Sequence, residues 1–201
     1  GIMSNGTSGD INNIDFRGGQ AKEAPYGRIK IVANDVAQAV ADALKSVKHS
    51  DWVPLAVAQM EITLGLRIPT KDEVEKAREV MKTSKLAPRM ETMEQVYARE
   101  TVLLADFPAK VSAPLQIMKI GDLHVSAIPA EVFVEIGLEL KKRHSPTFTV
   151  SLANAYHGYL PTPEHHALGG YETWRARSSC LEVDASTKIV AGLEELFEKL
   201  K

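Results

Sequence analysis

The chain has 201 residues, of which 44% are hydrophobic and 25% are charged, and its formal net charge at pH 7 is −2. These values are typical of a compact globular domain, and the lack of a basic block argues against a nucleic-acid-binding surface. No apolar run approaches the length of a membrane span. The one cysteine, Cys180, excludes an internal disulfide framework and a zinc cage of thiolates, so we expect it to be a small core residue.

The first half of the chain predicts a loop, a helix and a long strand. Residues 4–27 are rich in Gly, Asn, Asp and Pro, which favours a loop. From residue 28 to residue 47 apolar residues recur at helical intervals, which predicts a helix with a buried face. Over residues 55–68 apolar residues alternate with Gln59, Glu61, Thr63 and Arg67, which predicts a strand with one buried face.

Residues 70–105 predict a helical hairpin. Thr70, with Glu73 three residues later, has the pattern of a capping box, and a second helix is expected from about residue 91 to residue 105. Both helices are polar at most positions, so the hairpin is expected to lie on the surface. A solvated insertion and a lid over a site both fit this pattern.

The second half of the chain mixes strand and helix signals. Gly121-Asp122 separates two apolar runs and predicts a hairpin turn. The expected strands are residues 115–120, 123–128 and 148–152, and the expected helices are residues 132–143 and 184–200. We therefore expect an α/β (α+β) fold: a mixed β-sheet flanked by helices, with a helical hairpin insertion near 70–105, in a single domain over residues 1–201.

Polar and aromatic residues follow the two strands expected in this half. Glu131 lies between a strand and a helix, where it could stabilise the first helical turn or act in catalysis or metal binding. Tyr156 and Tyr159 could pack a loop against the core. A tyrosine is an uncommon metal ligand, because its phenol must lose a proton from a pKa near 10.

The same loop contains His157, His165 and His166, which are residues of the type that binds zinc. Adjacent histidines such as the last two point apart, so exposed histidines on a helix are the simpler interpretation. Asp10 lies in a Gly-rich turn that could be an Asx-turn or could present backbone N–H groups to an oxyanion. The run from Ser8 to Asp10 does not match the G-x-S-x-G nucleophile elbow.

Three motifs in this order resemble the neutral (non-lysosomal, alkaline) ceramidase family. They are the Gly-Asp loop at residues 5–12, the I-P-x-E segment at residues 128–131, and the N-x-Y-x-x-Y-x-x-T-P-E run at residues 154–164 followed by G-Y-E at 170–172. The resemblance implies the C-terminal portion of the family's catalytic domain. The third motif is the most specific of the three.

The resemblance implies a zinc-dependent hydrolase that cleaves the amide of N-acylsphingosine. Its zinc is held by two histidines, a glutamate and a tyrosine, and Glu131 and Tyr159 match the last two. Tyr171 matches a tyrosine at the substrate amide. No segment matches the two histidine ligands, so the zinc ligands are incomplete in this chain.

The Gly-Asp loop departs from the family pattern. Asn12 stands where the family has its catalytic serine, two residues after Asp10. An amide cannot attack a carbonyl, although it can donate a hydrogen bond to an oxyanion. We therefore expect Tyr171, Asn12 and Asp10 as catalytic residues, and Glu131 and Tyr159 as metal ligands.

These expectations define a zinc-dependent amidohydrolase domain that is inactive in isolation. Its expected partners are a small-molecule lipid amide and a missing N-terminal part of the same protein. The alternative is a non-catalytic module that binds a lipid or a glycan. A metal-free hydrolase would need Ser8, Ser126 or Ser151 as a nucleophile beside Tyr159.

Overall fold

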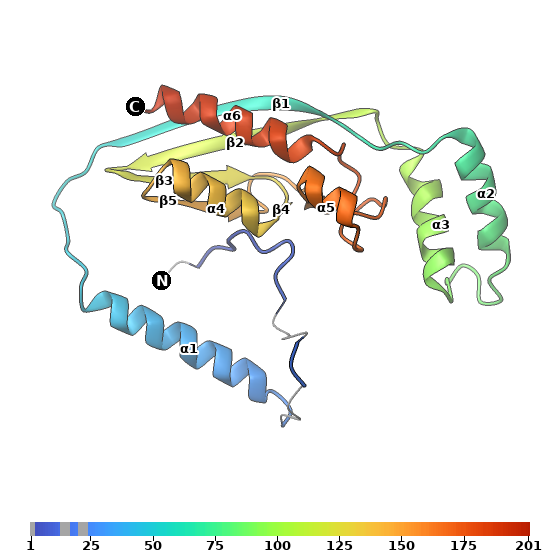
Figure 1. Cartoon of the computed structure of the whole chain (residues 1–201), viewed down its shortest axis with the longest axis horizontal. Coiled ribbons are helices and arrows are strands. Elements are labelled where there is room, and N and C mark those ends of the chain that lie inside the picture. Colours follow the sequence, from blue (N-terminus) through green and yellow to red (C-terminus); the bar gives the residue numbers. More distant parts are fainter. Residues whose placement is uncertain (1–2, 13–16, 20–23) are drawn as a thin grey trace. The chain divides into compact units, whose positions relative to one another are not determined.

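The computed structural model describes residues 3–12, 17–19 and 24–201 and divides the chain into two units (Figure 1). Unit 1 comprises residues 1–11 and 54–201, and unit 2 comprises residues 12–53. Within the described residues, no helix has both the length and the apolar composition needed to cross a bilayer. The expected single domain over residues 1–201 stays a prediction.

Unit 2 contains α1 (Gly27–Leu44), where the apolar spacing predicted a helix. We expected its apolar face to be buried, but no residue of α1 is buried. Ile29, Val36 and Val40 are 65%, 49% and 55% exposed. Among the described residues of unit 2 there is no second helix or strand against which this face could pack.

Unit 1 is built on a four-stranded mixed sheet. Its strands are β1 (Leu55–Gly65), β2 (Lys110–Ile120), β3 (Leu123–Ile128) and β5 (Thr147–Ser151), in the order β1-β2-β3-β5. The first two pairings are antiparallel, and β3 pairs with β5 in parallel. Gly121, with φ 61°, makes the tight turn between β2 and β3. The mixed sheet flanked by helices is confirmed.

The described residues of unit 1 form five helices: α2 (Lys71–Lys82), α3 (Met93–Leu104), α4 (Val134–Arg143), α5 (Pro163–Leu168) and α6 (Ala185–Lys199). Helices α2 and α3 form the predicted hairpin, and Figure 1 shows them at one end of the sheet. The predicted capping box is present, with the Thr70 side chain accepting a hydrogen bond from the Glu73 N–H group. The predicted helix at residues 132–143 begins later, because Val132 belongs to a short strand, β4.

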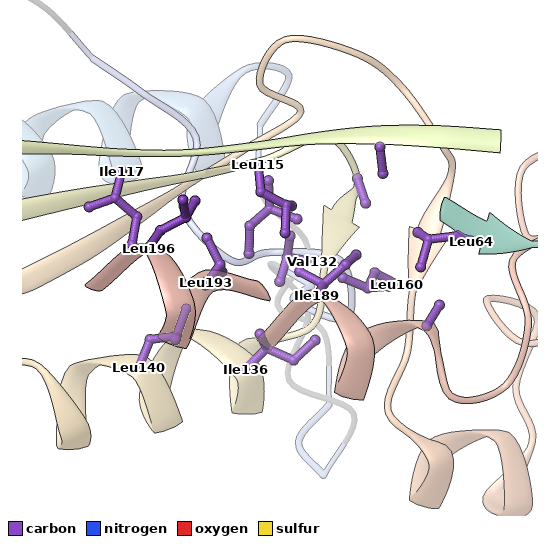
Figure 2. Close-up of a cluster of buried hydrophobic side chains, with 14 of the residues drawn as sticks. Leu64, Leu115, Ile117, Val132, Ile136, Leu140, Leu160, Ile189, Leu193 and Leu196 are labelled. Atoms are coloured by element: carbon purple, nitrogen blue, oxygen red, sulfur yellow. The ribbon is translucent and has the colours of Figure 1, made fainter. Parts of the chain in front are cut away.

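The core lies on one face of the sheet, where α4 and α6 cover it (Figure 2). Leu115 and Ile117 of β2 are fully buried in this core, together with Leu193 of α6. Helix α6 approaches closely at Gly192, where a Cβ atom would lie 2.8 Å from Leu115 Cδ1. Because side chains alternate along a strand, Gln59 of β1 is exposed on the other face.

The parallel pairing of β3 and β5 places their carboxyl ends next to each other. Ile128 at the end of β3 is paired with Ser151 at the end of β5. The chain continues from these two ends into residues 129–132 and 152–160, which pair again as β4 (Glu131–Val132) and β6 (Tyr159–Leu160). Polar residues of both segments are therefore brought to one edge of the sheet.

Candidate functional site

The candidate site is built on the two-residue strands β4 and β6. They pair in parallel, with Glu131 opposite Tyr159 and Val132 opposite Leu160. The Glu131 N–H group donates to the Gly158 carbonyl at 2.8 Å, which fixes this register. Residues directly opposite each other in paired strands present their side chains on the same face. The structure therefore brings Glu131 and Tyr159 side by side.

Two further tyrosines contact this pair. The Tyr156 hydroxyl donates a hydrogen bond to Glu131 Oε1 at 2.9 Å. The ring of Tyr171 meets the ring of Tyr159 edge to face, with centroids 5.9 Å apart and an interplanar angle of 86°. We call Glu131, Tyr156, Tyr159 and Tyr171 the tyrosine–glutamate cluster. Tyr156 was not among the expected ligands, although it stands in the same motif.

The surroundings raise the pKa values of Tyr156 and Tyr159 and so hold these two phenols in their neutral form. Burial raises the pKa of Tyr159, and hydrogen bonding with Tyr171 and the charge of Glu131 raise it further. Burial, followed by the hydrogen bond to Glu131, raises the pKa of Tyr156 to about 12. Tyr159 would therefore need a nearby cation to become an anionic ligand at neutral pH.

Removing the charge of Glu131 should make both phenols more acidic. In the Glu131→Gln variant we expect the pKa of Tyr156 to fall below its value of about 12, because the neutral amide no longer opposes a phenolate. Absorbance of the tyrosinates during an alkaline titration measures this shift. The Tyr26→Phe variant is the control, because it removes from the titration one tyrosine that is 75% exposed and lies outside the cluster, in unit 2. Unchanged titration of the Tyr156 signal would contradict the effect of Glu131.

The loop at residues 171–181 supports the cluster from the side of β6. The carbonyl of Ser178 accepts the Tyr159 N–H group at 2.8 Å. Arg67 donates to the carbonyl oxygens of Thr173, Ser179 and Leu181 in this loop at 2.9, 2.6 and 2.9 Å. Arg67, expected on the polar face of a strand, instead lies half-buried just after β1 and binds the loop.

The same loop is attached to the helical hairpin by two bidentate ion pairs. Arg175 contacts both carboxylate oxygens of Glu73 at 2.6 and 3.3 Å. Arg177 contacts both oxygens of Glu100 at 2.8 and 3.0 Å. The hydrogen bond from Arg175 is the largest cause that lowers the pKa of Glu73 to about 2. The hairpin is thereby tied to the loop that carries Tyr171.

The Gly-Asp loop lies against the other side of β4. The Gly9 N–H group donates to the Val132 carbonyl at 2.8 Å, and a Cβ atom on Gly9 would lie 2.5 Å from the Glu131 carbonyl oxygen. The Asp10 carboxylate accepts the Val134 N–H group at 2.9 Å. Asp10 therefore stabilises the first turn of α4, 124 residues away in the sequence, rather than forming an Asx-turn within its own loop.

Asp10 also belongs to a second group of potential ligands. One ligand atom each of Asp10, Glu135 and His165 lie within 4.8 Å of one another. His165 Nδ1 lies 2.8 Å from Thr162 Oγ1, and its Nε2 lies 3.7 Å from Glu135 Oε1. We call these three residues the Asp10 cluster. Of the histidines considered from sequence, His165 joins this group.

The other expected residues are not members of these two clusters. His157 has a buried Nε2 with no hydrogen-bond partner in the described part of the chain. Asn12 belongs to unit 2, so the structure does not place it relative to Glu131. Ser126, a candidate nucleophile, is fully buried and bonds to Thr149 at 2.9 Å, which indicates a structural role in the sheet. Cys180 is buried, as expected for a core residue.

The tyrosine–glutamate cluster fits one side of a zinc site. It offers a carboxylate and a phenol on the same face of two paired strands, and both are oxygen donors that zinc accepts. Structural zinc sites have four protein ligands and catalytic sites have three. Glu131 and Tyr159 are two oxygen donors, which is fewer than either kind of site requires.

Comparison with known proteins identifies the fold. The crystal structure of neutral ceramidase from Pseudomonas aeruginosa matches 94% of this chain with a TM-score of 0.61 at 16% sequence identity. The fold is neutral ceramidase-like. The predicted resemblance is confirmed at this level, and the chain spans 35% of the length of that ceramidase.

A second solved structure, of a ceramidase complexed with C2, matches 46% of this chain and 15% of its own, with 22% identity and a TM-score of 0.40. No protein-family model matches the chain, and no curated protein matches it significantly. The neutral ceramidase-like fold thus rests on the match that extends over nearly the whole chain.

Proposed function

We propose that this chain contributes half of the catalytic site of a zinc-dependent amide hydrolase that acts on a lipid amide of the N-acylsphingosine type. The observation that carries the proposal is the register of β4 and β6, which sets Glu131 opposite Tyr159, with Tyr171 in contact. The neutral ceramidase-like fold supports the same activity. The remaining metal ligands would come from outside these 201 residues.

Each residue of the cluster has a role in this proposal. Glu131 and Tyr159 would hold the ion, and Tyr156 would fix the orientation of the Glu131 carboxylate through its hydrogen bond of 2.9 Å. Zinc, when bound, supplies Lewis acidity at a carbonyl oxygen. Tyr171, which is 50% exposed, would donate a hydrogen bond to the negative charge that develops on that oxygen.

Zinc titration of the purified chain tests the proposal. We expect weak zinc binding, because two donors form an incomplete coordination shell. The Glu131→Gln and Tyr159→Phe variants should each lower this affinity roughly tenfold or more, since even loss of an outer-shell partner costs that much. Calorimetry and metal analysis after dialysis measure both effects.

Glu135→Gln is the matched control, because it removes a carboxylate from the Asp10 cluster four residues along the chain. Zinc affinity that depends on Glu135, and is unaffected by the change at Glu131, would refute the assignment. Tight, stoichiometric zinc in the chain alone would contradict an incomplete shell.

A non-catalytic lipid-binding module is the second candidate. It is favoured by Asn12, which occupies the position of the family serine and cannot act as a nucleophile. In this case a lipid amide would bind to the protein without being cleaved, even when zinc and the remaining part of a ceramidase-like domain are present. Mass spectrometry of the recovered amide distinguishes the two candidates.

A further inference from the structure

A cavity of about 430 Å³ lies between α3 and the loop at residues 171–181, within unit 1. This volume is in the range typical of small-molecule sites. Six of the residues that line it are Met93, Val96, Tyr97, Tyr156, Ala176 and Ser178. We call it the α3 cavity.

The α3 cavity is continuous with the tyrosine–glutamate cluster. Tyr156 lines the cavity, and its hydroxyl donates to Glu131 at 2.9 Å. Ser178 also lines it, and its carbonyl accepts the Tyr159 N–H group at 2.8 Å. A ligand in the cavity would therefore contact two residues that each hydrogen-bond to a candidate metal ligand.

The lining is mostly apolar and carries no net charge. The charged residues in it are Glu100 and Arg177, which neutralise each other in a bidentate ion pair. Met93 and Tyr156 are 61% and 58% exposed, so large apolar side chains face solvent here. A charged ligand would gain nothing from a neutral lining, whereas an apolar chain would remove these side chains from water.

We propose that the α3 cavity binds the hydrocarbon chain of the lipid amide whose carbonyl group lies at the tyrosine–glutamate cluster. The direction of the hydrocarbon chain in this inference rests on the proposed function. The location of the hydrocarbon chain rests on the contacts of Tyr156 and Ser178. Methionine is a suitable lining residue, because its flexible side chain adapts to chains of different shape. Residues of α3 would then determine which lengths of hydrocarbon chain bind.

The natural fluorescence of Trp174 provides the test. The Trp174 ring packs against Tyr97, which lines the cavity, with centroids 5.3 Å apart. The chain has two tryptophans, so the Trp52→Phe variant leaves Trp174 as the sole reporter. We expect 10-bromodecanamide to quench this fluorescence saturably. 3-bromopropanamide, which has the same head group on a short chain, should not.

Variants of α3 locate the binding site. Val96→Asp places a charge in the cavity and should weaken the binding of 10-bromodecanamide at least tenfold. Leu103→Asp, on the same helix but outside the lining, should leave it unchanged. Met93→Asp is a second cavity variant that should fold normally, because Met93 is exposed and an acidic residue is favoured in the first turn of a helix.

The outcomes separate this inference from the proposed function. Absence of saturable quenching by the long amide, or equal quenching in the Met93→Asp and Leu103→Asp variants, would overturn the cavity assignment. Quenching that persists in Glu131→Gln would support it, because that change affects the proposed metal site and leaves the cavity intact. Binding of the long amide in a protein whose zinc affinity depends on Glu135 and is unaffected by Glu131→Gln would leave the cavity assignment standing and refute the hydrolase.

Discussion

Replacing Arg67 by alanine should lower the free energy of unfolding of unit 1 by about 4 kcal/mol. The guanidinium group of Arg67 donates hydrogen bonds to three main-chain carbonyls, those of residues 173, 179 and 181, and also to Ser179 Oγ at 3.0 Å. Thr173, Ser179 and Leu181 are buried, so their carbonyls would lose a partner without gaining water. Urea unfolding followed by circular dichroism measures the loss.

The Arg67→Lys variant tests whether the planar fork of donors matters as well as the charge. Lysine keeps the charge but presents its donors from one nitrogen, so it should recover only a minor part of the lost stability. Arg89→Ala, at an exposed position, should change the free energy of unfolding by less than about 0.5 kcal/mol. Equal stability of the Arg67 and Arg89 variants would show that Arg67 does not organise the loop.

Local patterns in the sequence predict most of the regular elements of unit 1. The alternation after residue 55 predicts a strand, and β1 (Leu55–Gly65) has the expected alternating burial. The capping box at Thr70 predicts the start of α2, and Gly121-Asp122 predicts the turn between β2 and β3. These signals are local, because each depends on residues within one turn or one strand.

The sequence contains no comparable local pattern for the strands β4 and β6. A strand of two residues has too few positions for alternation to show, and it forms only because the other strand pairs with it. The register of Glu131 and Tyr159 therefore depends on tertiary structure. The motifs suggested that these two residues act together, but their pairing on adjacent strands could not be predicted from spacing.

Long-range contacts of polar residues were also beyond prediction from the sequence. The position of Asp10 in a Gly-rich segment suggests a local turn, whereas its carboxylate binds the N-terminus of α4. The position of Arg67 on the polar face of an alternating segment suggests a solvated side chain, whereas it donates to three carbonyls of a distant loop. In both cases the sequence shows that the residue is polar, and only the fold decides which partner it meets.

Gly158 is the position beside the candidate site where the backbone requires glycine most strictly. Its φ of 76° is a conformation that other residues rarely adopt, and a Cβ atom there would lie 2.3 Å from the Ser178 carbonyl oxygen. That carbonyl accepts the Tyr159 N–H group, so the clash falls on the hydrogen bond that holds Tyr159. Gly169 has a similar φ of 88°, but a Cβ atom there would meet nothing within 4 Å.

The two glycines therefore form a matched pair that separates backbone strain from close packing. Gly169→Ala should cost about 1–2 kcal/mol of unfolding free energy, from strain alone, whereas Gly158→Ala should cost about 4 kcal/mol, because the loop at Ser178 must also move. Urea unfolding of both variants gives the difference. Hydrogen exchange at the Tyr159 amide should become faster in Gly158→Ala and stay unchanged in Gly169→Ala. Equal costs at the two positions would mean that residues 158 and 178 are not in close contact, and that the support of Tyr159 by this loop is weaker than the structure indicates.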